Sequence, residues 1–129
     1  RDHRSPVLPS PNGTSRGITE LALLSEEGTE LAVWDLYGRT AMLIGRDVGE
    51  NDVDVNLDNT VYAGMIDVEH AVLNYTAGSW YVEDLNSRNG IAVQKAADGK
   101  KYRLSADKPC RLEKGDILFV GGLTRLAIR

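Results

Sequence analysis

The sequence predicts an all-β domain of about ten or eleven short strands, arranged as a sandwich or a barrel. Short apolar runs recur along the chain, and turn-forming pairs that contain glycine separate them. One run, Asp52–Leu57, alternates strictly between polar and apolar residues, which is the period of a strand with one buried face. No window longer than about ten residues keeps apolar residues at helical spacing.

The expected strands follow one another from residue 18 to the last residues of the chain. In Asp52–Leu57 the alternation places three aliphatic side chains on one face and three polar, solvated side chains on the other. Gly121-Gly122 stands between the last two apolar runs and suits a two-residue hairpin turn. The other expected strands are Ile18–Leu24, Glu30–Leu36, Thr40–Ile44, Ala71–Tyr75, Trp80–Leu85, Ile91–Gln94, Lys101–Leu104, Asp116–Val120 and Leu123–Ile128.

The chain of 129 residues is of the size of one domain, preceded by a segment of different composition. Pro6, Pro9 and Pro11 fall in the first eleven residues together with serine, asparagine and glycine. Such a segment has few apolar side chains to offset the entropy of ordering it. We therefore expect a flexible linker or tail over residues 1–17 and the folded domain over residues 18–129.

Composition argues against several classes of partner. The formal net charge is −4 and no dense run of lysine and arginine occurs, so we expect no affinity for nucleic acid. No stretch approaches the roughly 20 apolar residues of a membrane span, so we expect no membrane contact by this domain. Cys110 is the only cysteine, which excludes an internal disulfide and favours a reducing, cytoplasmic compartment.

Neither catalysis nor metal binding is indicated. The two histidines are His3 and His70, and no local motif such as G-x-S-x-G accompanies them. Asp52-x-Asp54-x-Asn56 resembles the opening of a calcium loop, but Leu57 and Ala63 replace the glycine and glutamate that the loop requires. We expect no enzyme, no catalytic residue, no metal site and no cofactor.

Three places carry residues that a plain sandwich does not require. They are Gly45-Arg46 after a strand, Asp67–Ala71 at the start of another, and Asp84–Gly90 after a third. Arginine offers a fork of donors that suits phosphate, and asparagine can donate and accept along a peptide backbone. The plain alternative is that both arginines are solvated and that Asn89-Gly90 forms a type I′ turn.

In order and spacing these elements resemble the forkhead-associated (FHA) domain. That family combines Gly-Arg, Ser-x-x-His-Ala, Trp, Asp-Leu-x-Ser-x-Asn-Gly and Gly-Asp. The matching residues here are Gly45-Arg46, His70-Ala71, Trp80, Asp84–Gly90 and Gly115-Asp116. The resemblance covers about residues 18–129, and it implies an eleven-stranded β-sandwich of FHA/SMAD type, a bacterial cytoplasmic origin and a role in signalling.

The resemblance also implies roles for individual residues. FHA domains typically bind a phosphothreonine peptide. By position, Arg46 meets the phosphate, Arg88 contacts the phosphate or the peptide, and Asn89 holds the peptide backbone. His70 is then structural and braces the loop through hydrogen bonds, with Gly45 and Gly90 as further structural positions of the motif.

The sequence departs from the family at the phosphate-binding serine, which falls on Asp67, and at the next residue, Val68. A hydroxyl donates to phosphate, whereas an ionised carboxylate only accepts. At about 5 Å from a phosphothreonine of charge near −2, the repulsion is ~2 kcal/mol in water and ~7 kcal/mol at intermediate dielectric. Micromolar binding amounts to ~8 kcal/mol, so the penalty is decisive. A pair between Asp67 and Arg46 is one hypothesis for what fills the phosphate position.

Three functions follow, in order of preference. The first is an FHA-like protein–protein interaction module with a degenerate phosphothreonine pocket, which binds an unphosphorylated partner or another domain of its own protein. The second is a functioning phosphothreonine reader that tolerates Asp67. The third, from another class, is a structural or self-association domain in which Leu43, Ile44 and the last hairpin face a partner chain.

Overall fold

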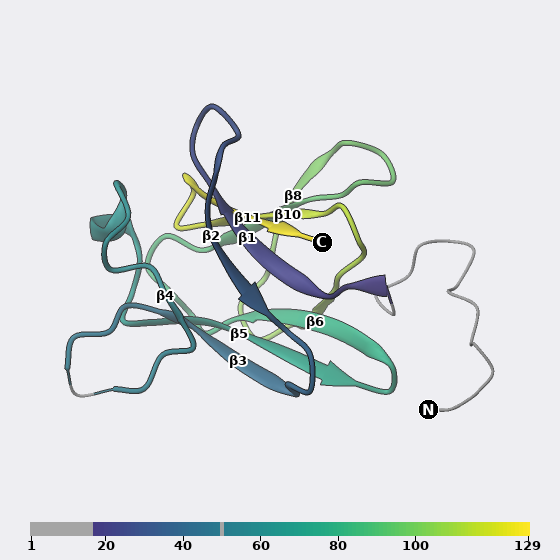
Figure 1. Ribbon diagram of the computed structural model, residues 1–129, viewed down its shortest axis with the longest axis horizontal. Coiled ribbons are helices and arrows are strands. Elements are labelled where there is room, and N and C mark those ends of the chain that lie inside the picture. Colours follow the sequence, from purple (N-terminus) through teal and green to yellow (C-terminus); the bar gives the residue numbers. More distant parts are fainter. Residues whose placement is uncertain (1–16, 50) are drawn as a thin grey trace.

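The computed structural model describes residues 17–49 and 51–129, and the expected tail over residues 1–17 lies outside this range except for Gly17. The described residues form eleven β-strands and one short 3₁₀ helix, η2, drawn in Figure 1. The strands are β1 (Glu20–Leu24), β2 (Glu30–Asp35), β3 (Ala41–Gly45), β4 (Val55–Asn56), β5 (Glu69–Thr76), β6 (Ser79–Asp84), β7 (Ile91–Gln94), β8 (Lys101–Arg103), β9 (Cys110–Arg111), β10 (Ile117–Val120) and β11 (Thr124–Ile128), and η2 is Ala63–Met65.

The strands form two sheets, which confirms the expected all-β sandwich. One sheet has six strands in the order β2-β1-β11-β10-β7-β8, and the other has five in the order β4-β3-β5-β6-β9. All neighbours are antiparallel except β3 and β4, which run parallel. Three of the four edge strands, β4, β8 and β9, are only two or three residues long, whereas the edge strand β2 has six residues, and β2 and β4 are edges of different sheets.

The core lies between the two sheets and is built by the period of two along each strand. In β10 and β11 the fully buried residues alternate with partly buried ones: Leu118 and Val120, then Leu126 and Ile128, point inward. The facing sheet supplies Met42, Ile44, Leu73, Trp80 and Val82, all nearly inaccessible to solvent. Burial of these side chains is the main driving force for the fold.

Two expected elements differ from the structure. Within Asp52–Leu57 only Val55–Asn56 forms a strand, although Val55 and Leu57 are buried as the alternation predicted. The Asp54 carboxylate is more than a solvated group, since it accepts hydrogen bonds from the Leu43 amide and the Arg39 guanidinium, both at 2.7 Å. The hydrogen bond from the Leu43 amide to this carboxylate takes the place of a backbone hydrogen bond that a longer β4 would make to β3.

The turn at Gly121-Gly122 is also longer than predicted. Val120 pairs with Thr124, so three residues connect β10 and β11, and both glycines have positive φ angles of 68° and 96°. A side chain on Gly121 would lie 2.6 Å from the Met65 carbonyl oxygen, which requires glycine there. Neither β9 nor η2 was predicted, because both are too short to show a periodic pattern in the sequence.

Antiparallel pairing brings three loops to one end of the five-stranded sheet. Gly45 at the end of β3 pairs with Glu69 at the start of β5, and Ala71 pairs with Asp84 at the end of β6. The segments that follow β3, precede β5 and follow β6 must therefore meet at that end. These segments contain the residues singled out from the sequence.

Asp116 anchors the other side of the sandwich through a buried carboxylate. Its side chain is fully buried and accepts from Lys95 Nζ at 2.7 Å, from the Ala96 amide at 2.9 Å and from the Glu113 amide at 2.8 Å. Burial lowers the pKa of Lys95, but the bond and charge of Asp116 outweigh this effect and raise that pKa overall.

Among the described residues no helix is long and apolar enough to cross a membrane.

We expect Asp116→Asn to lower the free energy of unfolding by about 3 kcal/mol, because one of the three donors loses its acceptor and the partly buried Lys95 ammonium keeps only the more distant of its two carboxylate partners, Glu113 at 3.4 Å. Urea denaturation followed by circular dichroism measures this difference. The control Asp52→Asn alters an exposed carboxylate and should change the stability by no more than about 0.5 kcal/mol. Equal stability of the two variants would contradict the prediction.

Candidate functional site

The candidate site is a shallow, open hollow where the three loops meet. Its lining comprises Arg46, Asp67, Val68, Glu69 and Arg88. Four of the five candidate binding residues from the sequence therefore lie around one feature. The fifth, Asn89, follows Arg88 directly and turns toward the 3₁₀ helix, where its Nδ2 donates to the Met65 carbonyl at 3.0 Å.

Gly45 sets how closely the loop after β3 approaches the start of β5. The Arg46 amide donates to the Val68 carbonyl at 3.0 Å, and a β-carbon on Gly45 would lie only 1.9 Å from the same oxygen. Any side chain there would push the two backbones apart. Glycine at position 45 therefore permits the backbone contact that places the Arg46 side chain over the hollow.

His70 joins the second and third loops from inside the domain. The imidazole is fully buried, accepts from the Asp67 amide through Nδ1 at 2.9 Å, and lies 2.8 Å from the Gly90 carbonyl through Nε2. A ring that accepts at Nδ1 donates at Nε2, so the two contacts define the tautomer. His70 therefore fixes the backbone on both sides of the hollow without reaching its surface.

Asp67 and Arg88 form an ion pair across the hollow. Arg88 Nε donates to the Asp67 carboxylate at 2.8 Å, and the Arg88 amide donates to its other oxygen at 3.1 Å. Partial burial by itself raises the pKa of Asp67, but the two bonds and the charge of Arg88 outweigh it and lower that pKa from its ordinary value of 3.8. The carboxylate is therefore ionised at neutral pH.

The hypothesis of a pair between Asp67 and Arg46 is wrong, because each residue has another partner. Arg46 Nη1 lies 3.2 Å from Asp58 Oδ1, and Arg46 Nε donates to the Ile66 carbonyl at 2.7 Å. Asp58 is a member of the site that the sequence did not reveal. It continues the polar alternation of Asp52–Leu57 by one step, but a regular alternation does not say which arginine it meets.

Three donor side chains of the site share one acceptor segment. Arg88 Nη2, Asn89 Nδ2 and Arg46 Nε donate to the consecutive carbonyls of Gly64, Met65 and Ile66, at 3.4, 3.0 and 2.7 Å respectively. This segment is the end of η2 and the residue after it, which sequence analysis did not predict. Each of the three side chains expected to hold a ligand therefore already makes at least one hydrogen bond within the domain.

Asp84 and Ser87 shape the third loop and were not among the candidate residues. The buried Asp84 accepts from Ser87 Oγ at 2.6 Å, and Ser87 Oγ in turn accepts from the Gly90 amide at 2.9 Å. Asn89 has no positive φ, so Asn89-Gly90 is not a type I′ turn, while Asn86 has a φ of 61°. The spacing of Asp and Ser by three residues is the signal that could have indicated this turn.

Comparison with known proteins assigns the family. The family model of the FHA domain matches residues 42–121, which is more than half of the chain and includes all three loops. The chain belongs to the FHA family. No curated protein sequence matches it.

Solved FHA structures share the fold at low sequence identity. The FHA domain of the CT664 protein from Chlamydia trachomatis is 20% identical, with a TM-score of 0.63 over 86% of this chain and 95% of that one. The N-terminal FHA domain of Rad53p from Saccharomyces cerevisiae, solved with a phosphothreonine peptide, is 15% identical, with a TM-score of 0.62 over 87% and 94%. Full-length yeast Pml1p is 21% identical, with a TM-score of 0.64 over 85% and 79%. FHA domains are protein–protein interaction modules, and homologues of this chain bind phosphopeptides.

Gly45→Ala should destabilise this FHA domain by about 3 kcal/mol, since the new methyl group would overlap the Val68 carbonyl. Gly64→Ala is the matched control, because nothing lies within 4 Å of the added carbon and the φ is ordinary. Thermal unfolding of the two variants compares them directly. A Gly45→Ala variant as stable as Gly64→Ala would show that the loops do not depend on this approach.

Replacing Arg88 by glutamine should raise the pKa of the Asp67 carboxyl, because the burial that opposes ionisation remains while the cation is lost. The lowered pKa means that this pair stabilises the fold above about pH 4, the ordinary pKa in the unfolded chain. The contribution is lost as the pH falls through the folded-state value. Carboxyl ¹³C NMR titration measures the pKa, and Arg39→Gln, which removes a partner of Asp54, should leave that of Asp67 unchanged.

Proposed function

We propose that this FHA domain is a protein–protein interaction module without enzymatic activity, and that it does not depend on phosphothreonine. The observation that carries the proposal is the ion pair between Asp67 and Arg88, at the position where the family places a phosphate-binding serine. A carboxylate oxygen already fills part of the role that a ligand phosphate has in phosphopeptide readers.

The hydrogen bonds of the site support this proposal. A phosphate needs donors that are free, or that become free at small cost, and guanidinium groups supply them best. Here Arg88 donates to Asp67 and Gly64, and Arg46 donates to Asp58 and Ile66, so a phosphate would have to compete with these bonds for the two guanidinium groups. Exchange of one anion for another adds little net binding energy.

The charge of the hollow points the same way. Two guanidinium groups, on Arg46 and Arg88, and two carboxylates, on Asp67 and Glu69, line the hollow, and a third carboxylate, on Asp58, lies beside Arg46. A phosphothreonine that entered would bring a charge near −2 into a region that is already net negative. For an unpaired carboxylate about 5 Å from the phosphate the repulsion would be ~2 to ~7 kcal/mol, and the Arg88 guanidinium paired with Asp67 offsets part of it. An unphosphorylated partner avoids this cost.

The partner class that we propose is therefore a protein segment or domain recognised without a phosphate. Among similar structures, human APLF was solved with an XRCC1 bisphospho peptide and the yeast Rad53p domain with a phosphothreonine peptide, whereas the FhaA FHA domain was solved with the intracellular domain of Rv3910. The retained Arg46 and Arg88 keep a phosphothreonine reader as the second candidate function, because both still line the hollow. A single pair of titrations separates the two.

We expect the domain to bind a degenerate phosphothreonine peptide library no more tightly than the unphosphorylated library. Asp67→Ser should gain at least about tenfold for the phosphorylated library, which corresponds to ~1.4 kcal/mol of relieved repulsion and new hydrogen bonding. Fluorescence anisotropy with labelled libraries measures both affinities.

Asp35→Ser is the matched control, since it removes the same charge from an exposed position on β2 in the other sheet. It should gain nothing for either library. Tight, phosphate-dependent binding by the unaltered domain would overturn the proposal in favour of a phosphothreonine reader.

A further inference from the structure

We propose that a groove at the open side of the sandwich binds an extended segment of a partner protein, one that carries a large apolar side chain beside a lysine or arginine. The edge groove, as we name it, lies between β2 and the segment after β4, and its defining residues are Leu31, Trp34, Val61, Tyr62 and Thr124. It shares no lining residue with the hollow of Arg46 and Asp67, so it is independent of the phosphate question.

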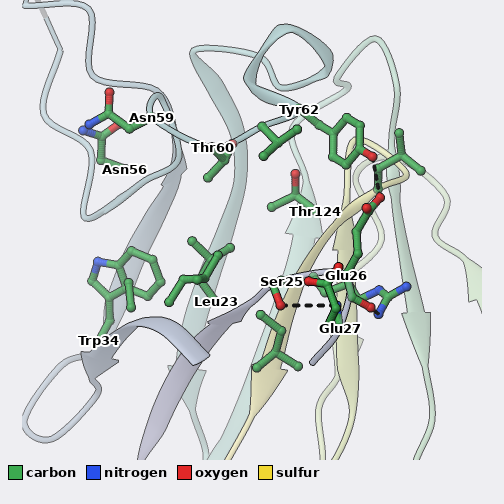
Figure 2. Close-up of a pocket in the computed structure, with 16 residues that line it drawn as sticks. Leu23, Ser25, Glu26, Glu27, Trp34, Asn56, Asn59, Thr60, Tyr62 and Thr124 are labelled. Carbon is green, nitrogen blue, oxygen red and sulfur yellow. Dashed lines mark hydrogen bonds between the residues drawn. The ribbon is translucent and has the colours of Figure 1, made fainter. Parts of the chain in front are cut away.

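The edge groove exists because the two sheets end on the same side without covering each other. β2 is the outermost strand of one sheet and β4 is the outermost strand of the other, and both lie on the left in Figure 1. The space between them is about 570 Å³, within the range of pockets that hold a ligand or a peptide side chain. Figure 2 shows Trp34 at one end and Tyr62 at the other, with Leu23 on the floor.

The walls of the edge groove are apolar and open to solvent. Leu31 is 59% exposed, Val61 is 88% exposed and Leu123 is 49% exposed, and all three line the same groove. Single exposed aliphatic residues are ordinary, but several around one concave feature indicate a contact surface. The aromatic rings of Trp34 and Tyr62 add the large, rigid side chains that binding sites favour.

The floor carries a hydroxyl group that lacks a partner. Thr124 is only 5% exposed, and its Oγ1 has no hydrogen-bond partner among the described residues. Figure 2 shows this oxygen directed into the space between Thr60 and Tyr62. Buried polar groups are almost always paired, because leaving one unpaired is costly. The oxygen is itself covered by its neighbours, so a backbone amide or carbonyl of a bound peptide satisfies it once those side chains move apart on binding.

The rim of the edge groove selects the charge of the partner. Glu26 and Glu27 face a single cation, Arg125, whose guanidinium donates to the Glu26 carbonyl at 3.4 Å. The Tyr62 hydroxyl donates to the Glu26 carboxylate, which orients it toward the groove. The rim is therefore net negative, so it favours a lysine or arginine and disfavours an acidic or phosphorylated segment.

The neighbouring backbone favours an extended peptide over a compact ligand. Within the described part of the chain β2 pairs with β1 alone, so its outer edge offers amide and carbonyl groups to an added strand. Added strands gain affinity from such main-chain bonds and specificity from side chains that enter adjacent pockets. In the proposed complex the peptide adds as a strand beside β2. It places one apolar side chain in the edge groove and a neighbouring basic side chain at the rim.

The test uses the full chain and a phage-displayed library of random twelve-residue peptides. We expect enriched sequences to share an apolar residue with lysine or arginine nearby, and a synthetic consensus peptide to bind in isothermal titration calorimetry. Leu31→Gln and Val61→Gln should each weaken its binding at least about tenfold, as expected when a hot-spot contact is lost. Tyr37→Gln, at an apolar residue that is 91% exposed and lies outside the groove, should leave it unchanged.

Thr124→Val separates binding from folding. It should weaken the consensus peptide about two- to tenfold, the effect of one hydrogen bond, while the thermal midpoint of the free domain stays equal or rises because an unpaired hydroxyl is gone. Asp67→Ser should not alter this binding, so the proposed function and this inference can fail separately. The inference is overturned if no peptide is enriched, if the groove variants bind as well as Tyr37→Gln, or if those variants change the oligomeric state instead.

Discussion

The buried imidazole of His70 is the contact on which the site depends. It ties the Asp67 amide before β5 to the Gly90 carbonyl after β6, two segments that are also joined by the Asp67–Arg88 ion pair and by strand pairing. Gly90 in turn accepts from Gly121, so the brace extends to the turn between β10 and β11. Because a fully buried ring must satisfy both nitrogens, the two loops have little freedom to separate. Loops are usually the mobile part of a β-sandwich, and here they are anchored from within.

At the surface of the hollow, the side chains of both arginines and of Asn89 donate hydrogen bonds to groups of the same chain. The carbonyls of residues 64–66 accept from Arg46, Arg88 and Asn89, and the carboxylates of Asp58 and Asp67 accept from the two arginines. Exposed ion pairs add little to stability, and Arg88 is 65% exposed, so these contacts matter mainly for what they exclude. A ligand anion must compete with ordered partners that are covalently part of the same chain. The fold belongs to the family, whereas the function of this surface depends on its own residues.

A β-sandwich also offers surfaces that its loops do not use. Closed barrels have no edges, whereas this sandwich leaves β2 and β4 as outer strands and the edge groove between them. Apolar walls, an unpaired buried hydroxyl and an acidic rim occur together there, each set by residues far apart in sequence. Interaction modules often separate the surface that gives affinity from the one that gives regulation. The two surfaces here differ in charge pattern and in the elements that build them.

The class of fold, the position of nearly every strand and the family were all predictable from the amino-acid sequence. These depend on local patterns: apolar alternation, glycine at turns, and five short motifs in order. The sequence also singled out Arg46, Asp67, Arg88 and Asn89, which the structure brings together at the loop end. Only the tertiary structure decided which arginine meets Asp67, because charges separated by about twenty residues in sequence can pair in several ways and backbone geometry selects one. The same holds for η2 and β9, which are too short for a periodic signal, and for the edge groove, whose walls come from β2, the segment after β4 and the last hairpin.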